Sequence, residues 1–177
     1  MAGTDRERGV RRRGLVSEYD PDWPTQCAHL ARHFRAIAGP ALEGIEHVGG
    51  TAVPGMIAKP ILDIDLVVRP DRWTALVSAL AAAGVRHVGD QGISGREVFK
   101  PLHRGAWPRV HLYACAPDSE ELRRHLAFRD YLRTHPIAAA ELGARKWSLA
   151  DRDIETYQAG KAALVQAILA RALLIKP

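Results

Sequence analysis

Two aspartates, Asp63 and Asp65, stand in a short apolar run and are the side chains best placed to do chemistry. The run, residues 61–68, is rich in β-branched residues and lies between Pro60 and Pro70, which is typical of a β-strand. Side chains alternate along a strand, so both carboxylates point from one face, roughly 6.6 Å apart at about 3.3 Å of rise per residue. Two like charges on one face repel each other, and a divalent cation between them is the simplest way to offset that repulsion.

The opposite face of this strand is wholly apolar and is formed by Leu62, Ile64, Leu66 and Val68. A strand with one apolar and one acidic face predicts that the apolar side packs in the core. We therefore expect the two carboxylates to line a cleft that solvent can reach, instead of pairing with buried basic side chains.

A glycine turn comes shortly before the aspartate strand. Gly49 and Gly50 follow a candidate strand at residues 44–48, and Thr51 comes next. Glycine lets the backbone approach a ligand closely and turn its N–H groups toward an anion, and the threonine hydroxyl adds a donor. A turn that can bind phosphate, followed by a strand that can bind a metal ion, is typical of active sites for phosphoryl or nucleotidyl transfer.

Hydrophobic periodicity along the rest of the chain predicts the elements that must position these residues. Helices are predicted at residues 22–37, 71–83, 119–135, 137–148 and from 151 onward, and strands at 44–48, 61–68, 85–88, 98–102 and 109–115. The resulting order, α-β-β-α-β-β-β-α-α-α, predicts an α+β fold with a mixed sheet, helices packed on one side of it, and a helical C-terminal half.

The glycine turn and the aspartates together resemble a known signature. Gly49-Gly50, twelve intervening residues and Asp63-Ile64-Asp65-Leu66 are similar to the pattern of the polymerase-β-type nucleotidyltransferase superfamily. More narrowly, residues 47–64 resemble the GrpB family (uncharacterised protein family 0157). Further segments resemble the same family in the expected order, from about residue 17 to the C-terminus: YDPDWP at 19–24, GISGR at 92–96, HLY at 111–113, FRDYLRTHP at 128–136 and YQAGK at 157–161.

The resemblance implies a nucleotidyltransferase-like fold and the transfer of a nucleotidyl group from a nucleoside triphosphate to a small-molecule acceptor. Asp63 and Asp65 would hold Mg²⁺ (or Mn²⁺), which bridges the phosphates of the substrate. The backbone N–H groups of residues 49–51 would cradle the phosphates, and Arg96 with Lys59 would stabilise the leaving pyrophosphate.

The chain departs from the superfamily pattern at two positions. Gly50 stands where the turn usually has a serine, which removes one hydroxyl. Active members present a third carboxylate on a later strand, and the corresponding strand here, residues 109–115, has His111. A neutral histidine can bind a metal ion but brings no negative charge. We include His111 among the expected catalytic residues. The alternative function is therefore a catalytically reduced protein of the same fold that binds a nucleotide or phosphate ligand.

Three basic side chains are candidates for binding phosphate. Arg96 follows a glycine-containing loop and is expected to clamp an acidic substrate. Lys59 has two equally weighted interpretations, neutralising a phosphate or pairing with Asp63. Lys161 lies four residues after Tyr157, so the two share a helix face, and it is expected to reach a partner charge or the ligand.

The other histidines are expected to be surface or helix-cap residues, and they are His29, His33, His87, His125 and His135.

The chain's 177 residues, 47% hydrophobic and 25% charged, are typical of one globular domain. We expect residues 17–177 to form it and residues 1–16 to be a disordered basic tail. Residues 1–14 hold five arginines, at positions 6, 8, 11, 12 and 13, against two acidic residues, a net charge of +3. The remaining 20 basic and 18 acidic residues contribute +2, so the body is close to neutral.

The near-neutral body and an aromatic content of 6% disfavour specific nucleic-acid binding. No apolar run approaches the roughly 20 residues that a membrane-spanning helix needs, so no membrane partner is expected. Cys27 and Cys115 are isolated in apolar settings, which is typical of buried free thiols in a reducing cytoplasm. The expected partners are a nucleoside triphosphate and a small-molecule acceptor.

Overall fold

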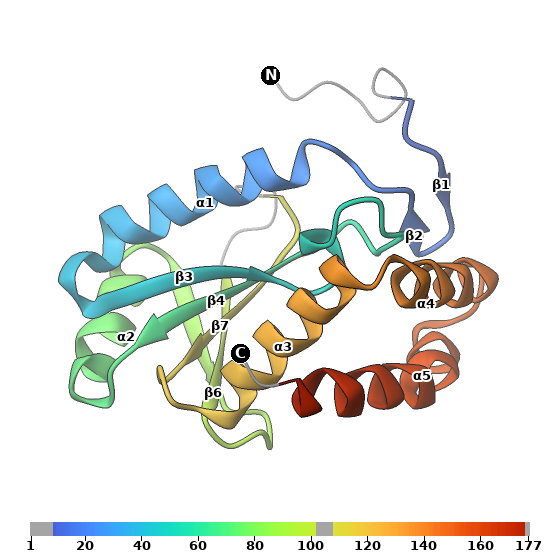
Figure 1. Cartoon of the computed structure of the whole chain (residues 1–177). Coiled ribbons are helices and arrows are strands. Elements are labelled where there is room, and N and C mark those ends of the chain that lie inside the picture. The colour runs from blue at the N-terminus through green and yellow to red at the C-terminus, as the bar shows by residue number, and fades with distance from the viewer. Residues whose placement is uncertain (1–8, 102–107, 176–177) are drawn as a thin grey trace. The chain divides into compact units, whose positions relative to one another are not determined.

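The computed structural model describes residues 9–101 and 108–175 of the chain (Figure 1). These residues form two compact units. The sheet unit comprises residues 22–48, 61–101 and 108–125, and the helical unit comprises residues 9–21, 49–60 and 126–175. The first eight residues of the expected tail and the last residue of the strand predicted at 98–102 lie outside the described residues.

A mixed β-sheet forms the centre of the sheet unit (Figure 1). Within the described residues it has five strands in the order β3-β4-β7-β6-β5, with the bounds Leu42–Val48 for β3, Leu62–Val68 for β4, Val110–Cys115 for β7, Arg96–Pro101 for β6 and Val85–Gly89 for β5. β4 and β7 run parallel, and the other neighbouring pairs are antiparallel. The predicted α+β fold is confirmed, and the aspartate strand β4 lies one strand in from the sheet edge.

Two helices, α1 (Trp23–Ala38) and α2 (Trp73–Ala82), contact this sheet. The apolar residues of α1, which include Phe34, lie on one buried face of the helix, as their helical spacing predicts. α2 ends before Gly84, which takes a φ of +76°, a left-handed conformation that glycine adopts without strain. The apolar side chains of β4 at positions 62, 64, 66 and 68 are at most 1% exposed, so the predicted core face of this strand is confirmed.

A third helix, α3 (Glu120–Thr134), begins in the sheet unit. Ser119 caps it, because its Oγ accepts a hydrogen bond from the backbone N of Leu122 at 3.3 Å. One turn later His125 reaches Asp65, which points from the acidic face of β4. The prediction that helices pack on one side of the sheet is therefore wrong. Helix α3 also covers the acidic face of β4, because His125 forms a hydrogen bond with the carboxylate of Asp65.

The helical unit contains the rest of α3 together with α4 (Pro136–Ser148) and α5 (Ile154–Leu174). Asp153 caps α5 by accepting a hydrogen bond from the backbone N of Thr156 at 2.8 Å, and that bond lowers the pKa of its carboxyl. In the described part of the chain no helix, α5 included, has the length and apolar character needed to cross a membrane. One core cluster of this unit consists of Val53, Met56, Leu132, Ala138, Ala139, Leu142 and Ile168.

Residues 9–16, which were expected to belong to a disordered tail, are part of ordered structure. β1 (Arg12–Arg13) pairs antiparallel with β2 (Val16–Ser17). Val16 is 1% exposed and packs in a second core cluster with Tyr157. The ordered chain therefore begins before residue 17, because this segment supplies apolar surface that the helical unit buries.

Both cysteines, Cys27 and Cys115, are free and buried, as predicted. Burial raises the pKa of the Cys27 thiol to about 11. Burial, together with the nearby charge of Asp65, raises the pKa of Cys115 to about 12. Neither thiol is therefore a reactive thiolate near neutral pH.

Candidate active site

The two aspartates of β4 each form a hydrogen bond with a histidine from another element. His111 Nδ1 lies 2.8 Å from Asp63 Oδ1, and His125 Nδ1 lies 2.7 Å from Asp65 Oδ2. Asp63 and His111 are register partners on the parallel strands β4 and β7, so their side chains point from the same face. Because an ionised carboxylate can only accept, the Nδ1 atom of each histidine carries the proton.

The two carboxylates differ sharply in burial. The side chain of Asp63 is 26% exposed, whereas that of Asp65 is fully buried. The expectation that both line a solvent-reachable cleft is therefore wrong for Asp65, because α3 covers it through His125. Among the described residues, Asp65 Oδ1 has no hydrogen-bond partner. A buried carboxylate oxygen without a partner is costly, and a bound cation is one group that satisfies it.

His125 lies between two carboxylates. Its Nε2 is 3.2 Å from Oε1 of Glu121, which lies one turn earlier on α3. Burial by itself lowers the pKa of His125, but the hydrogen bond and charge of Asp65 and the charges of Glu121 and Asp63 outweigh burial and raise it. The imidazolium can then donate from both ring nitrogens.

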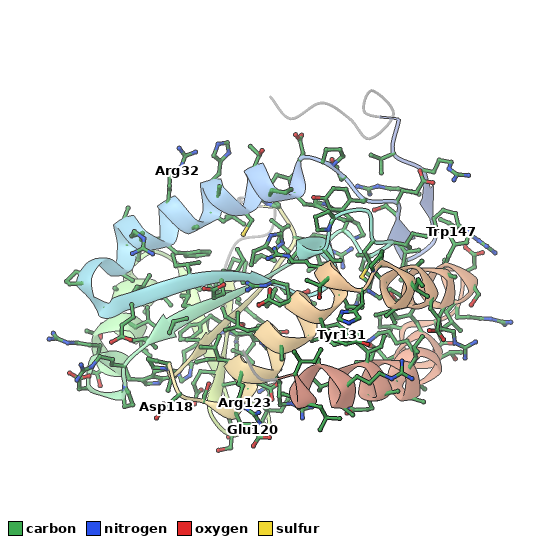
Figure 2. The ribbon with its side chains drawn as sticks, viewed as in Figure 1. Arg32, Asp118, Glu120, Arg123, Tyr131 and Trp147 are labelled. Atoms are coloured by element: carbon green, nitrogen blue, oxygen red, sulfur yellow. The ribbon has the colours of Figure 1, made fainter. Side chains whose placement is uncertain are left out.

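The expectation that His125 is a surface or cap residue is wrong. A sequence signal existed, because Glu121 and His125 are four residues apart and so share one face of α3. Figure 2 shows the other side of the helix, where Glu120 and Arg123 point away from the sheet, and both are well exposed. The spacing of Glu121 and His125 does not show that their face of α3 contacts the aspartates, because many surface helices carry pairs with the same spacing.

We predict that the stability of the metal-free protein falls as pH rises through the folded pKa of His125. Its folded pKa is raised above the unfolded value of about 6.5, so its contribution is fully present below that pH and is lost above the folded pKa. Urea unfolding in EDTA at a series of pH values from about 6 upward measures the slope. The His125→Asn variant serves as the control and should show a shallower slope. Parallel pH profiles for the two proteins would contradict the prediction.

Arg96 and Tyr113 border the same cluster. The guanidinium carbon of Arg96 lies 4.6 Å from the centroid of the Tyr113 ring. That ring centroid is in turn 6.2 Å from the ring of His111 and 6.0 Å from the ring of His125. Burial, with a contribution from the charge of Asp63, raises the pKa of Tyr113 to about 12, so its hydroxyl stays protonated. Nε of Arg96 is buried and, within the described residues, has no hydrogen-bond partner.

The donor set suits one kind of metal ion. Among the described residues, no three His, Cys, Asp or Glu side chains are grouped as ligands of one ion, as a metal site made by the protein alone would require. Mg²⁺ is usually held by one or two carboxylates, with waters and substrate phosphates completing its shell. Asp63 and Asp65 match that smaller requirement, and the buried, unpaired Oδ1 of Asp65 fits a cation as its partner.

The glycine turn belongs to the helical unit. Gly49 takes a φ of +71°, and residues 50–52 form a single 3₁₀ turn closed by the backbone N of Ala52 donating to O of Gly49 at 3.3 Å. Arg133 of α3 holds the turn by donating from Nε to O of Ala52 at 2.9 Å. Thr51 is 1% exposed. The turn is thus fixed by its own backbone hydrogen bond and by the side chain of Arg133 from α3.

Lys146 of α4 lies against this turn and was not anticipated. It is 8% exposed, and its Nζ lies 3.5 Å from the sulfur of Met56. A Cβ placed on Gly50 would lie 2.8 Å from that Nζ. The sequence carries no signal for this approach, because Lys146 stands in a helix that also has the exposed Arg145 beside it.

Lys59 and Lys161 come together at Tyr157. Their ammonium nitrogens lie 5.7 and 5.9 Å from the centroid of the Tyr157 ring. The predicted common face of Tyr157 and Lys161 on α5 is confirmed by this geometry. The candidate residues thus fall into two groups. Asp63, Asp65, His111 and Arg96 lie in the sheet unit, and Gly49, Gly50, Thr51, Lys59 and Lys161 lie in the helical unit.

The comparison with solved structures concerns the fold. The mixed sheet with an aspartate strand is nucleotidyltransferase-like, and the chain superposes on the structure of Cid1 in complex with its short product ApU with a TM-score of 0.50. That match covers 73% of this chain and 40% of Cid1 at 11% identity, so it concerns the fold alone.

Residues 15–171 match the family model described as GrpB protein, and the chain belongs to the GrpB family. It is 40% identical over 163 residues to the UPF0157 protein PA4798 of Pseudomonas aeruginosa, covering 87% of this chain and 65% of that protein's length. The crystal structure of the conserved protein GrpB from Enterococcus faecalis superposes with a TM-score of 0.80 at 31% identity, covering 90% of this chain and 98% of that one.

Proposed function

We propose that this protein transfers a nucleotidyl group from a nucleoside triphosphate to a small-molecule acceptor with the help of a divalent cation. The observation that carries the proposal is the state of Asp65, a fully buried carboxylate. One of its oxygens is bonded to His125, and the other has no hydrogen-bond partner in the part of the chain that the structure describes. Asp63 lies two residues away on the same strand face. A pair of carboxylates with an unsatisfied oxygen is the arrangement that a cation bound to phosphates would complete.

Asp63 and Asp65 would hold the cation, Mg²⁺ or Mn²⁺. When bound, it supplies positive charge to the phosphate oxygens of the substrate. His125 keeps Asp65 in place from the side of α3, and the imidazolium form keeps the local charge balanced when no cation is present. The residue of the sheet unit proposed to bind phosphate is Arg96. The phosphate-binding candidates of the helical unit are Gly49, Gly50, Thr51, Lys59 and Lys161.

His111 acts as the general base. Its Nδ1 donates to Asp63, which leaves Nε2 to accept a proton, and its side chain is 45% exposed. The acceptor oxygen attacks the α-phosphorus and forms a new P–O bond, while the bond from that phosphorus to the oxygen bridging to the β-phosphate breaks. Pyrophosphate leaves with the electron pair of the broken bond, and the acceptor's hydroxyl proton passes to Nε2 of His111.

A second candidate is a ligand-binding protein without turnover. The observation in its favour is His111 itself, the register partner of Asp63, because a histidine there brings no negative charge where a third carboxylate would. Such a protein would bind the nucleotide and its cation through the same residues and release them unchanged.

Turnover and binding are separated by one set of measurements. Calorimetric titration of the four common nucleoside triphosphates, with and without Mg²⁺, is expected to show binding that depends on Mg²⁺. Incubation with pools of hydroxyl-, amine- and phosphate-bearing small molecules should then release pyrophosphate. We expect His111→Gln to keep the affinity and to lower the rate by about 10²- to 10⁴-fold. Binding without pyrophosphate release from any pool supports the second candidate, and absence of nucleotide binding contradicts both.

A further inference from the structure

A cavity of about 440 Å³ lies in the helical unit, beside the basic N-terminal segment. Its lining combines apolar side chains, Ile57, Ala144 and Trp147, with two arginines, Arg11 and Arg13. Cavities of roughly 300–1,000 Å³ are typical of sites that bind small molecules. Within the described part of the chain, its walls share no residue with the proposed active site, so the transfer reaction does not account for them.

The N-terminal wall of the cavity is fastened to the rest of the helical unit by main-chain contacts. The backbone N of Leu15 donates to O of Ala150 at 2.8 Å. Ser17 and Ala58 exchange two backbone hydrogen bonds, at 2.9 and 3.1 Å. Gly14, at a φ of +48°, packs so closely that an added Cβ would lie 2.1 Å from O of Ala150. The wall is therefore held in place without a ligand, as is usual for small-molecule sites.

Trp147 gives the cavity a flat apolar surface. It lies near the end of α4 (Figure 2), three residues after Ala144 and therefore on the same face of the helix. Its ring packs against the core cluster that contains Val16 and Tyr157, yet the residue stays partly exposed. Because tryptophan rings stack well on other aromatic groups, the cavity favours a ligand with a planar aromatic body.

The two arginines of the cavity differ in their partners. Arg11 donates from Nε to Oε1 of Glu18 at 2.8 Å, and this carboxylate, which also lines the cavity, neutralises it. Arg13 donates from Nε to Oδ2 of Asp151 at 2.7 Å, and its two terminal nitrogens have no partner among the described residues. The N–H groups along one edge of a guanidinium can bind an oxyanion through two parallel hydrogen bonds, so Arg13 suits one anionic group.

We propose that this cavity binds a small molecule with a planar aromatic body and one oxyanion group, a carboxylate or a phosphate. The aromatic body lies against Trp147, and the oxyanion accepts hydrogen bonds from the terminal nitrogens of Arg13. The proposal does not rest on the proposed function, because neither the aspartates of β4 nor a metal ion takes part in it.

Calorimetric titration of the full-length protein in EDTA tests the proposal with probes that contain no nucleoside. 2-Naphthoate and 2-naphthyl phosphate carry both the ring and an oxyanion, whereas 2-naphthamide carries the ring alone and inorganic phosphate the oxyanion alone. We expect each aromatic anion to bind on the order of 10-fold more tightly than either partial probe. Whichever aromatic anion binds more tightly identifies the oxyanion as a carboxylate or a phosphate.

Three variants locate the binding site. Arg13→Gln removes the guanidinium and should weaken the binding of both aromatic anions on the order of 10-fold, without a loss for 2-naphthamide. Trp147→Leu keeps an apolar side chain without the ring and should weaken the binding of all the naphthyl probes by about 2- to 10-fold. Arg12→Gln is the matched control and should bind as the wild type does, because Arg12 is exposed and does not line the cavity.

Three results would overturn the proposal. The first is the absence of binding by either aromatic anion up to about 1 mM, or an equal affinity for 2-naphthamide. The second is an equal loss of affinity in Arg13→Gln and Arg12→Gln, because net charge alone would then attract the anions. The third is a melting temperature without ligand that is much lower for Arg13→Gln than for Arg12→Gln. The two should melt together, since exposed ion pairs contribute little to stability.

Discussion

Replacing Asp63 by asparagine is expected to abolish both the transfer reaction and any rise in melting temperature caused by Mg²⁺ or Mn²⁺. The substitution removes one of the two carboxylates proposed to hold the cation. An ion that binds only the folded protein raises its stability, so losing the ion's affinity also removes that gain. Without metal, the variant should be as stable as the wild type or more stable by about 0.5–2 kcal/mol, because repulsion between the two aspartates is relieved.

Thermal melts of both proteins, each in EDTA and in excess Mg²⁺ or Mn²⁺, measure these effects. Asp118→Asn is a matched control, since Asp118 is an exposed aspartate just before α3 and is outside the proposed metal site (Figure 2). It should respond to metal as the wild type does. A clear loss of stability in metal-free Asp63→Asn, together with no metal response in the wild type, would mean that Asp63 only positions His111, and it would refute the proposed function.

The largest change in stability is expected at His125. His125→Ala removes the hydrogen-bond partner of Asp65 Oδ2. It leaves a fully buried carboxylate with no partner at either oxygen among residues 9–101 and 108–175. Removing one partner of a buried pair costs about 3–5 kcal/mol, most of it from the charge left behind. Urea unfolding without metal, at a pH near 6 where the imidazolium contributes fully, gives the free energy of unfolding directly.

A double-mutant cycle with Asp65→Asn shows whether this cost comes from the pair. The double variant should be less destabilised than the sum of the two single variants, by about 0.5–3 kcal/mol. His29→Ala, at an exposed position of α1, controls for loss of a histidine and should change stability by no more than about 0.5 kcal/mol. Additive effects of His125→Ala and Asp65→Asn would show that the two side chains are not energetically coupled.

Local pattern determined most of the secondary structure. Alternation along residues 61–68 and the breaks at the flanking prolines were enough to predict β4, its buried apolar face and the shared face of Asp63 and Asp65. Helical spacing likewise predicted that Tyr157 and Lys161 point together on α5. These features depend on residues within a few positions of each other, so backbone geometry alone relates them. The order of residues 9–16 was not predicted, because their basic composition is typical of a disordered tail. A single residue, Val16, packs in the core of the helical unit.

The partners of the key side chains were decided by tertiary structure. His111 lies 48 residues from Asp63 along the chain, and His125 lies 60 residues from Asp65. Lys146 and Gly50 are nearly a hundred residues apart. Periodicity identifies the face on which a side chain lies but not the element that covers it. That choice depends on strand order, on the parallel pairing of β4 with β7, and on the burial of whole helix faces, and a hydrophobic pattern is nearly the same for many such arrangements.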